Sequence, residues 1–399
     1  EPGRSRQDPG HRQGRHQVAD RSVGAEPGSN ETVLALDGVT KRFGAAAAVE
    51  CVSMSIRRGE VFTLLGPSGC GKTTTLRLVA GLEHPDAGEI TLRDRLVASA
   101  PRRLFLAPNQ RNLGMVFQSY AVWPHMTVFE NVAYPLELRG MKRALVRDKV
   151  ARVLDLVGLG GMEGRPGTLL SGGQMQRLAL CRALVYEPDL LLLDEPFSNL
   201  DAKLREQMRV EVKLLQRRLG ITVLFVTHDQ VEALSLSDRI AVMHGGRVEQ
   251  VASPRCLYEE PASAFVRDFL GQTVILHGQV GAVGPGAADV VVSLNGSLAE
   301  RTLVGRPAPS ATLAPGAPAH VTIRPEDIEV CREDPGRPQA NRLPGVIDTL
   351  SFVGDRYEAR VALGGEHRIV LLLPRDRAWR EGDRIELGFP PAMVSVWPA

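Results

Sequence analysis

Long apolar runs are absent from this sequence. A helix that crosses a bilayer needs about 20 consecutive apolar residues, whereas the longest candidates here, such as residues 190–193, have the length of a strand. No hydrophobic signal segment is visible near the first residue either. We therefore expect no membrane-spanning helix in this chain.

Cysteine is also scarce. Disulfide frameworks and zinc sites place cysteines at short, regular spacings, but the cysteines of this chain are odd in number, widely spaced and without a C-x-x-C pair. Neither kind of site is indicated, and a reducing cytosol is the simplest compartment. The five are Cys51, Cys70, Cys181, Cys256 and Cys331.

Neither sign of charge dominates. The chain has 48 Lys and Arg residues against 46 Asp and Glu residues, a formal net charge of +2. A large nucleic-acid surface needs a strongly basic face, so this balance argues against one and leaves only a local patch open. The 399 residues, with 43% hydrophobic content, are typical of a globular protein with about two or three domains.

Large apolar side chains are almost missing from residues 1–30, which are rich in Arg, Gly, Pro, Gln and His. Such a segment cannot bury enough surface to offset the entropy of ordering it, and we predict a disordered tail. A nucleic-acid-binding arm is the less favoured alternative, because Glu1, Asp8, Asp20 and Glu26 dilute the arginines.

The stretch around which the chain is organised is 61–73. An apolar run typical of a buried strand (61–65) is followed by Gly-Pro-Ser-Gly-Cys-Gly-Lys-Thr, which fits G-x-x-x-x-G-K-[ST], and then by a predicted helix (73–80). Glycines let backbone N–H groups surround a phosphate, and the helix N-terminus faces the same oxygens. We predict a nucleoside triphosphate site, with Lys72 on the β- and γ-phosphates and Thr73 on Mg²⁺; an ordinary glycine turn is the alternative. The predicted contacts are Gly66, Pro67, Ser68, Gly69, Cys70, Gly71, Lys72, Thr73 and Thr74.

Cys70 and Phe43 are two candidate nucleotide contacts whose side chains have properties of their own. Cys70 lies within the glycine loop, so we expect thiol alkylation to inhibit the site and a bound nucleoside triphosphate to protect the thiol. Phe43 has polar neighbours and could stack on a purine ring. A core phenylalanine is an equal alternative on local sequence alone.

A second anion site is predicted at residues 170–174, Leu-Ser-Gly-Gly-Gln, which open a helix running to about residue 186. Ser171 is a preferred N-cap residue, and Gly172 and Gly173 expose the first backbone N–H groups. A capped helix without a ligand is an equal alternative.

Acidic and imidazole side chains follow two predicted buried strands. The strand 189–193 ends at Asp194 and Glu195, and the strand 222–226 leads to His228. Parallel strands present their carboxyl ends to one crevice, so we expect Asp194 to hold Mg²⁺, Glu195 to deprotonate the attacking water, and His228 to contact phosphate or that water. Pairing of the carboxylates with an arginine, and a structural histidine, are the alternatives.

The remaining patterns predict the surroundings of these motifs. Strands at 33–36 and 48–56 indicate a small antiparallel sheet, and residues 127–139 and 143–157 have helical periodicity. Beyond residue 253 the chain turns to short alternating runs separated by turns, which predict a small β-barrel or a barrel pair. Because that part carries no phosphate, metal or triad signature, we expect a binding or regulatory module.

Taken together, these motifs make the segment 31–399 similar to the ATP-binding subunit of ATP-binding-cassette (ABC) transporters, which it resembles over that whole range. Leu-Ser-Gly-Gly-Gln distinguishes this family from other P-loop enzymes. The family's motifs occur in fixed order: Gly66 to Thr73, Gln118, Leu170 to Gln174, Leu190 to Glu195, Ser198 to Asp201, and His228.

The importer subgroup that takes up iron(III), polyamines, sugars or anions is the closer resemblance. Residues 119–130 look like its segment facing the membrane subunits, with contact near Trp123, Pro124, His125 and Met126. Residues 323–327 and 382–384 resemble its C-terminal regulatory (TOBE) domain.

The resemblance implies an α/β fold, a P-loop NTPase with a RecA-like core plus antiparallel β and helical (about 119–186) subdomains, followed by a small all-β OB-like domain. The implied domains are 31–262 for nucleotide binding and 272–399 for regulation.

The resemblance also implies a homodimer in which each ATP lies between the Lys72 loop of one copy and Ser171, Gly172, Gly173 and Gln174 of the other. Phe43 is then the adenine-stacking residue, Gln118 a Mg²⁺ ligand or water-positioning group, and Asp201 a residue of the nucleotide site.

The partners so implied are separate membrane permease subunits and, indirectly, an extracytoplasmic solute-binding protein, with the chain at the cytoplasmic face of the membrane and no nucleic acid bound. A non-transport ATPase of DNA repair or translation, or a chiefly regulatory ATPase, is the alternative function. Export is disfavoured by the C-terminal β-domain.

Overall fold

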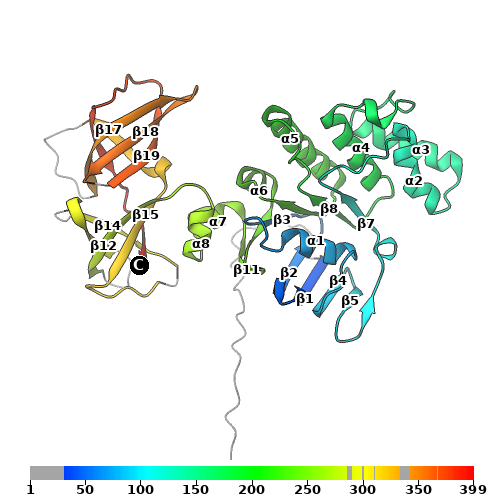
Figure 1. Ribbon diagram of the computed structural model, residues 1–399, viewed down its shortest axis with the longest axis horizontal. Coiled ribbons are helices and arrows are strands. Elements are labelled where there is room, and N and C mark those ends of the chain that lie inside the picture. The colour runs from blue at the N-terminus through cyan, green and yellow to red at the C-terminus, as the bar shows by residue number, and fades with distance from the viewer. Residues whose placement is uncertain (1–30, 285–289, 299–300, 310, 333–340, 366) are drawn as a thin grey trace, which may run out of the picture.

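The computed structural model describes two bodies joined by short helices (Figure 1). The described residues are 31–284, 290–298, 301–309, 311–332, 341–365 and 367–399; the predicted tail at 1–30 lies outside them. Among these residues no helix is long and apolar enough to cross a membrane.

A six-stranded sheet forms the centre of the first body. Three of its strands are buried along their whole length, which is why their sequences read as unbroken apolar runs. All neighbouring pairs are parallel except the antiparallel edge pair β10–β11. The carboxyl ends of the parallel strands therefore meet at one edge. The strands, in sheet order, are β11 (Arg247–Ala252), β10 (Arg239–His244), β3 (Val61–Leu65), β9 (Val223–Thr227), β8 (Leu190–Asp194) and β7 (Leu113–Val116).

A second, antiparallel sheet lies beside β11 and confirms the small sheet predicted near residues 33–56. It is larger than the sequence indicated, because the strand at 95–99 and the short strand at 104–105 were not predicted. Its strands, in order, are β2 (Ala46–Arg57), β1 (Thr32–Phe43), β4 (Ala87–Leu92), β5 (Arg95–Ser99) and β6 (Leu104–Phe105).

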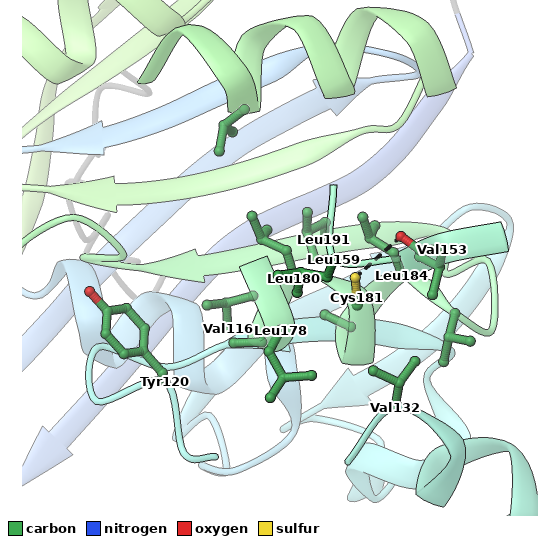
Figure 2. Packing of buried hydrophobic residues seen from close by; sticks show 14 of the residues in the cluster. Val116, Tyr120, Val132, Val153, Leu159, Leu178, Leu180, Cys181, Leu184 and Leu191 are labelled. Carbon is green, nitrogen blue, oxygen red and sulfur yellow. Dashed lines mark hydrogen bonds between the residues drawn. The ribbon is translucent and has the colours of Figure 1, made fainter. Parts of the chain in front are cut away.

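Helices surround the central sheet. Figure 2 shows the core between α4, α3 and β8, where the Cys181 thiol donates to the carbonyl of Val153 at 3.3 Å. Burial raises the pKa of Cys181, so it is a packing residue. The helices are α1 (Lys72–Ala80), α2 (Val128–Leu138), α3 (Arg143–Leu156), α4 (Gly172–Leu184), α5 (Ala202–Leu219) and α6 (Gln230–Leu236).

Two short helices, α7 (Pro254–Glu259) and α8 (Ala264–Phe269), connect the bodies. Leu257 of α7 and Val266 of α8 are fully buried in one cluster with Leu65. These helices therefore pack with the first body, and the boundary predicted at residue 262 stays a prediction.

The second body is all-β, as expected, and combines one closed barrel with one open sheet that share a hydrophobic core. The barrel closes only because the last strand pairs with β14 and β15, a long-range pairing that the sequence did not indicate. The barrel contains β12 (Val274–Val283), β13 (Val290–Leu294), β14 (Thr302–Pro307), β21 (Ser395–Pro398) and β15 (Pro318–Ile323). The open sheet contains β16 (Glu329–Arg332), β20 (Arg384–Gly388), β17 (Arg342–Phe352), β18 (Arg356–Gly364) and β19 (His367–Pro374).

Arg111 stabilises the helix that follows the glycine loop. Its side chain is 2% exposed, and its guanidinium donates at 2.8 Å to the carbonyls of Leu78 and Val79, which end α1, and to that of Leu106. Carbonyls at a helix C-terminus have no partner within the helix, and a cation there also complements the helix dipole. Burial lowers the pKa of Arg111 to about 10.

We expect Arg111→Met to lower the free energy of unfolding by about 2–4 kcal/mol, because the buried carbonyls lose their donors. Urea unfolding followed by circular dichroism measures this loss. The control is Arg102→Met, whose side chain is 70% exposed. An Arg111→Met protein as stable as the control would contradict this role.

Candidate functional site

The glycine loop between β3 and α1 has a shape that side chains would destroy. A Cβ atom at Gly66 would lie 2.3 Å from the carbonyl oxygen of Met243, and one at Gly71 would lie 2.2 Å from that of Ala48. Gly71 also has a left-handed φ of +103°, and Gly69 has one of +80° with open space around it. The loop can therefore curl against the sheet and expose its backbone, as a phosphate cradle requires.

Lys72 places a buried positive charge inside this loop. Its side chain is 5% exposed, and its ammonium donates to the carbonyls of Gly66 at 2.8 Å and Pro67 at 2.9 Å. No carboxylate pairs with it among the described residues. The ammonium also donates to the sulfur of Cys70 at 3.8 Å. A buried cation held by neutral acceptors fits an anionic ligand such as a triphosphate.

Thr73 and Asp194 meet across the edge of the sheet, where the Thr73 hydroxyl donates to Asp194 at 3.2 Å. Burial raises the pKa of Asp194, and the neighbouring Glu195 raises it further. A hydroxyl beside a carboxylate suits Mg²⁺, which takes one or two carboxylates plus substrate phosphates. No group of three or more potential ligands of the His, Cys, Asp or Glu type occurs in the described part of the chain.

Glu195 and His228 face each other at the ends of adjacent strands. The His228 Nδ1 lies 3.1 Å from a Glu195 carboxylate oxygen, and the Glu195 amide donates to the carbonyl of Val226 in β9 at 3.0 Å. Glu195 has a left-handed φ of +45°. A non-glycine residue held in this region stores strain, which is common at functional sites.

Gln118 and Asp201 lie in loops near this edge. Gln118 is exposed, and its carbonyl accepts a 2.8 Å bond from the side chain of Asn199. Asp201 caps α5 by accepting from the Leu204 amide at 2.9 Å. The tie between the loops through Asn199 was not predicted, because a loop-to-loop bond leaves no periodic signal in the sequence.

Ser171 lies elsewhere in the first body, and within one chain it is not part of the edge formed by β3, β8 and β9. It is exposed and caps α4 with Gln174, through amide bonds of 3.0 and 3.4 Å. A Cβ at Gly173 would lie 3.1 Å from Leu204. Helix α4 packs on β7, α2 and α3, whereas α1 packs on β8 and β9 (Figure 1). The predicted N-cap at Ser171 is present, and its binding of a nucleotide stays a prediction.

Two readings made from the sequence change with the structure. Phe43 is 52% exposed at the end of β1, so it is not a core phenylalanine; its stacking role stays a prediction. The thiol of Cys70 is 4% exposed, and burial raises its pKa. Rapid alkylation of Cys70 is therefore no longer expected, because the side chain is buried and its raised pKa disfavours the reactive thiolate.

The segment expected to face membrane subunits is partly exposed. Pro124 and His125 are exposed, while Trp123 is half-buried against Tyr134, with ring centroids 4.9 Å apart. The main chain around Trp123 is held by the fully buried Asn131, which accepts from the Trp123 amide at 3.0 Å.

Comparison with known proteins adds family relationships. A family model described as "ABC transporter" matches residues 49–198, and one described as "TOBE domain" matches 321–397. The chain is 44% identical over 380 residues to the spermidine/putrescine import ATP-binding protein PotA of Rubrobacter xylanophilus, covering 94% of this chain and 96% of that protein. It is 46% identical over 336 residues to the Fe(3+) ions import ATP-binding protein FbpC of Brucella abortus, covering 84% and 88%.

A solved structure of an ABC transporter protein resembles part of this chain in fold. The protein cbiO1 from Clostridium perfringens, described as part of the ABC transporter complex cbiONQ, superposes with a TM-score of 0.51. The sequence identity is 26%, over 56% of this chain and 90% of that one.

We expect Glu195→Gln to retain ATP binding and to lose about 10²–10⁴-fold in hydrolysis rate, the range typical of a removed general base. Phosphate release measures the rate, and equilibrium binding of ATP measures the affinity. Glu206→Gln, an exposed change on α5, is the matched control. Hydrolysis by Glu195→Gln at the control's rate would remove Glu195 from this role.

Proposed function

This chain belongs to the ABC transporter family, as an ATP-hydrolysing subunit of the importer type with a C-terminal TOBE domain, and from this premise we propose that two copies clasp ATP between them and drive solute uptake through separate membrane subunits. The convergence of the glycine loop, the Thr73–Asp194 pair and the Glu195–His228 pair at one edge of the sheet supports this proposal most strongly.

The residues at this edge have distinct roles. Lys72 and the loop amides bind the β- and γ-phosphates, and Phe43 stacks on the adenine. Glu195 accepts a proton from the water that attacks the γ-phosphorus, while the bond from that phosphorus to the β–γ bridging oxygen breaks. His228 orients the Glu195 carboxylate, which it already contacts at 3.1 Å.

Mg²⁺ is the proposed metal at this edge. Thr73 and Asp194 would hold it, with Gln118 as a third ligand or as a group that positions the water. When bound, the ion neutralises charge on the phosphates.

The second copy completes the site in this proposal. The N-terminus of α4, with Ser171, Gly172 and Gly173, offers amide dipoles to the γ-phosphate. Gln174 follows in the first turn of this helix, and Asp201 is a further proposed contact of the nucleotide. Because α4 and α1 pack in different parts of the first body, the two anion-binding termini are best satisfied by one triphosphate held between copies. The charge of ATP then closes the dimer, and loss of phosphate opens it.

Membrane permease subunits are the proposed partners, through the surface near Trp123, Pro124, His125 and Met126, at the cytoplasmic face of the membrane. An extracytoplasmic solute-binding protein would act indirectly. Residues 31–262, which comprise the central sheet, the antiparallel sheet and the helices, form the proposed nucleotide-binding domain. Residues 272–399 form the proposed regulatory domain. The names of the relatives favour import over DNA repair or translation.

A polyamine or iron(III) is the proposed solute, since relatives of this chain are named for importing these; sugars and anions are the remaining options. We expect vesicles containing the chain and its co-purified membrane subunits to accumulate spermidine or Fe³⁺ only with ATP. Vesicles with Glu195→Gln are the control. ATP-independent uptake would contradict the coupling, and uptake of neither solute would contradict this choice.

Shared ATP binding predicts that Ser171→Arg weakens the ATP-induced dimer by about tenfold or more, equivalent to at least about 1.4 kcal/mol. The larger side chain would occupy the space between the helix N-terminus and the phosphates. Light scattering of Glu195→Gln protein with ATP and Mg²⁺ measures the dimer, and Ser235→Arg, on the exposed face of α6, is the control. An undiminished dimer would contradict sharing across copies.

A further inference from the structure

Arg182, in the last turns of α4, is a buried cation that the proposed reaction does not use. Its side chain is 8% exposed, and it forms no ion pair among the described residues. Burial lowers its pKa. A charge removed from water without a counter-charge is costly unless dipoles satisfy it, so its hydrogen-bond partners show what it does.

The partners are two consecutive main-chain carbonyls. The Arg182 guanidinium donates to the carbonyl of Ala121 at 2.6 Å and to that of Tyr120 at 2.7 Å. Both residues have left-handed backbone angles, φ +61° for Tyr120 and +46° for Ala121. Residues with a Cβ atom resist this conformation, and two in sequence are less favourable still. The surrounding structure must therefore hold them there.

The same guanidinium also contacts the segment that follows. It lies 4.6 Å from the ring of Trp123, a cation–π distance. Trp123 is fastened from the other side by Asn131 of α2, whose side chain also donates to the Trp123 carbonyl at 3.2 Å. The segment 120–123 is thus held between α4 and α2, and Tyr120 belongs to the same buried cluster as Leu178 of α4 (Figure 2).

We propose that Arg182 is a positioning residue that holds Tyr120 and Ala121 in their left-handed conformation and so couples the movement of α4 to the surface around Trp123. This proposal rests on the function proposed above, in which the first residues of α4 bind the ATP of the second copy and Trp123 lies at the membrane subunits. A helix is stiff over this length of about 15 Å. A displacement of its N-terminus therefore reaches the two carbonyls that Arg182 holds.

Packing alone does not explain this arginine. An apolar side chain of similar volume would fill the same space without placing a charge among carbonyls, and such replacements are often neutral or stabilising. The two short hydrogen bonds to residues with left-handed φ indicate that the N–H donors of Arg182, and not only its volume, stabilise the segment. Arg182→Met and Arg182→Gln therefore separate volume from hydrogen bonding.

We call the contact of Arg182 with the carbonyls of Tyr120 and Ala121 the clamp. Hydrogen–deuterium exchange of the isolated protein tests it without any membrane partner. The Tyr120 amide donates to the Phe117 carbonyl and the Trp123 amide to Asn131, so both report on the segment. We expect faster exchange at 120–123 in Arg182→Met and Arg182→Gln, and an intermediate rate in Arg182→Lys, which keeps the charge but not the forked donors.

A second-site change makes this test specific. Glycine adopts a φ of +46° without steric cost, so Ala121→Gly should slow the exchange of Arg182→Gln back toward wild type. Arg177→Gln is the control on the same helix, because Arg177 instead bonds Glu211 at 2.5 Å. Unchanged exchange in both Arg182→Met and Arg182→Gln, or no restoration by glycine, would overturn the clamp.

The coupling is tested with membrane subunits present. We expect Arg182→Gln to lose about fivefold or more of the stimulation of ATP hydrolysis by those subunits, the lower range for coupling between sites, with ATP affinity unchanged. Ala121→Gly should restore part of it. Full stimulation in a protein whose segment 120–123 exchanges fast would overturn the coupling. If the membrane subunits did not stimulate ATP hydrolysis by the wild-type protein, the proposed function would be contradicted. The hydrogen–deuterium exchange result would still test the role of Arg182 in holding the segment.

Discussion

The parallel register of the central sheet is the constraint on which the site depends. Leu65 of β3 pairs with Thr227 of β9, and Asp194 of β8 pairs with Val226. Because neighbouring strands end level with each other, the residues just after them are brought to one edge although they are far apart in sequence. The glycine loop, the two carboxylates and His228 owe their proximity to this register, and the Thr73–Asp194 and Glu195–His228 contacts form between the segments that it brings together.

Three buried cations in the first body are bonded to carbonyl oxygens, with different consequences. Arg111 ends helix α1 and so supports the loop at the other end of that helix. Lys72 holds the loop itself, and Arg182 holds the strained segment after Gln118. A carbonyl partner leaves the positive charge without a counter-charge, and at Lys72 this favours binding of an anion. At the two arginines, the several donors of one guanidinium hold main-chain carbonyls in place.

Much of the fold could be predicted from the sequence. The unbroken apolar runs of β3, β8 and β9 indicated a buried parallel sheet, and the family resemblance, confirmed by the relatives, implied the ABC ATPase fold with a C-terminal β-domain. Strands β5, β6, β14, β16 and β21 were not predicted, because each has only two to six residues and its pairing partners are set by the tertiary structure. The site residues were chosen from motifs, and their chemical roles stay predictions.

The sequence by itself determined which chemistry is present: glycines where the loop approaches Met243 and Ala48, a lysine and threonine at the start of α1, and carboxylates after a buried strand. Local patterns carry this information because backbone conformation and side-chain type are local properties. The tertiary structure alone decided that Cys70 is buried, that Phe43 is exposed, and that Arg182 reaches the carbonyls of Tyr120 and Ala121. Burial and long-range hydrogen bonds depend on which distant elements pack together, and no local pattern records that.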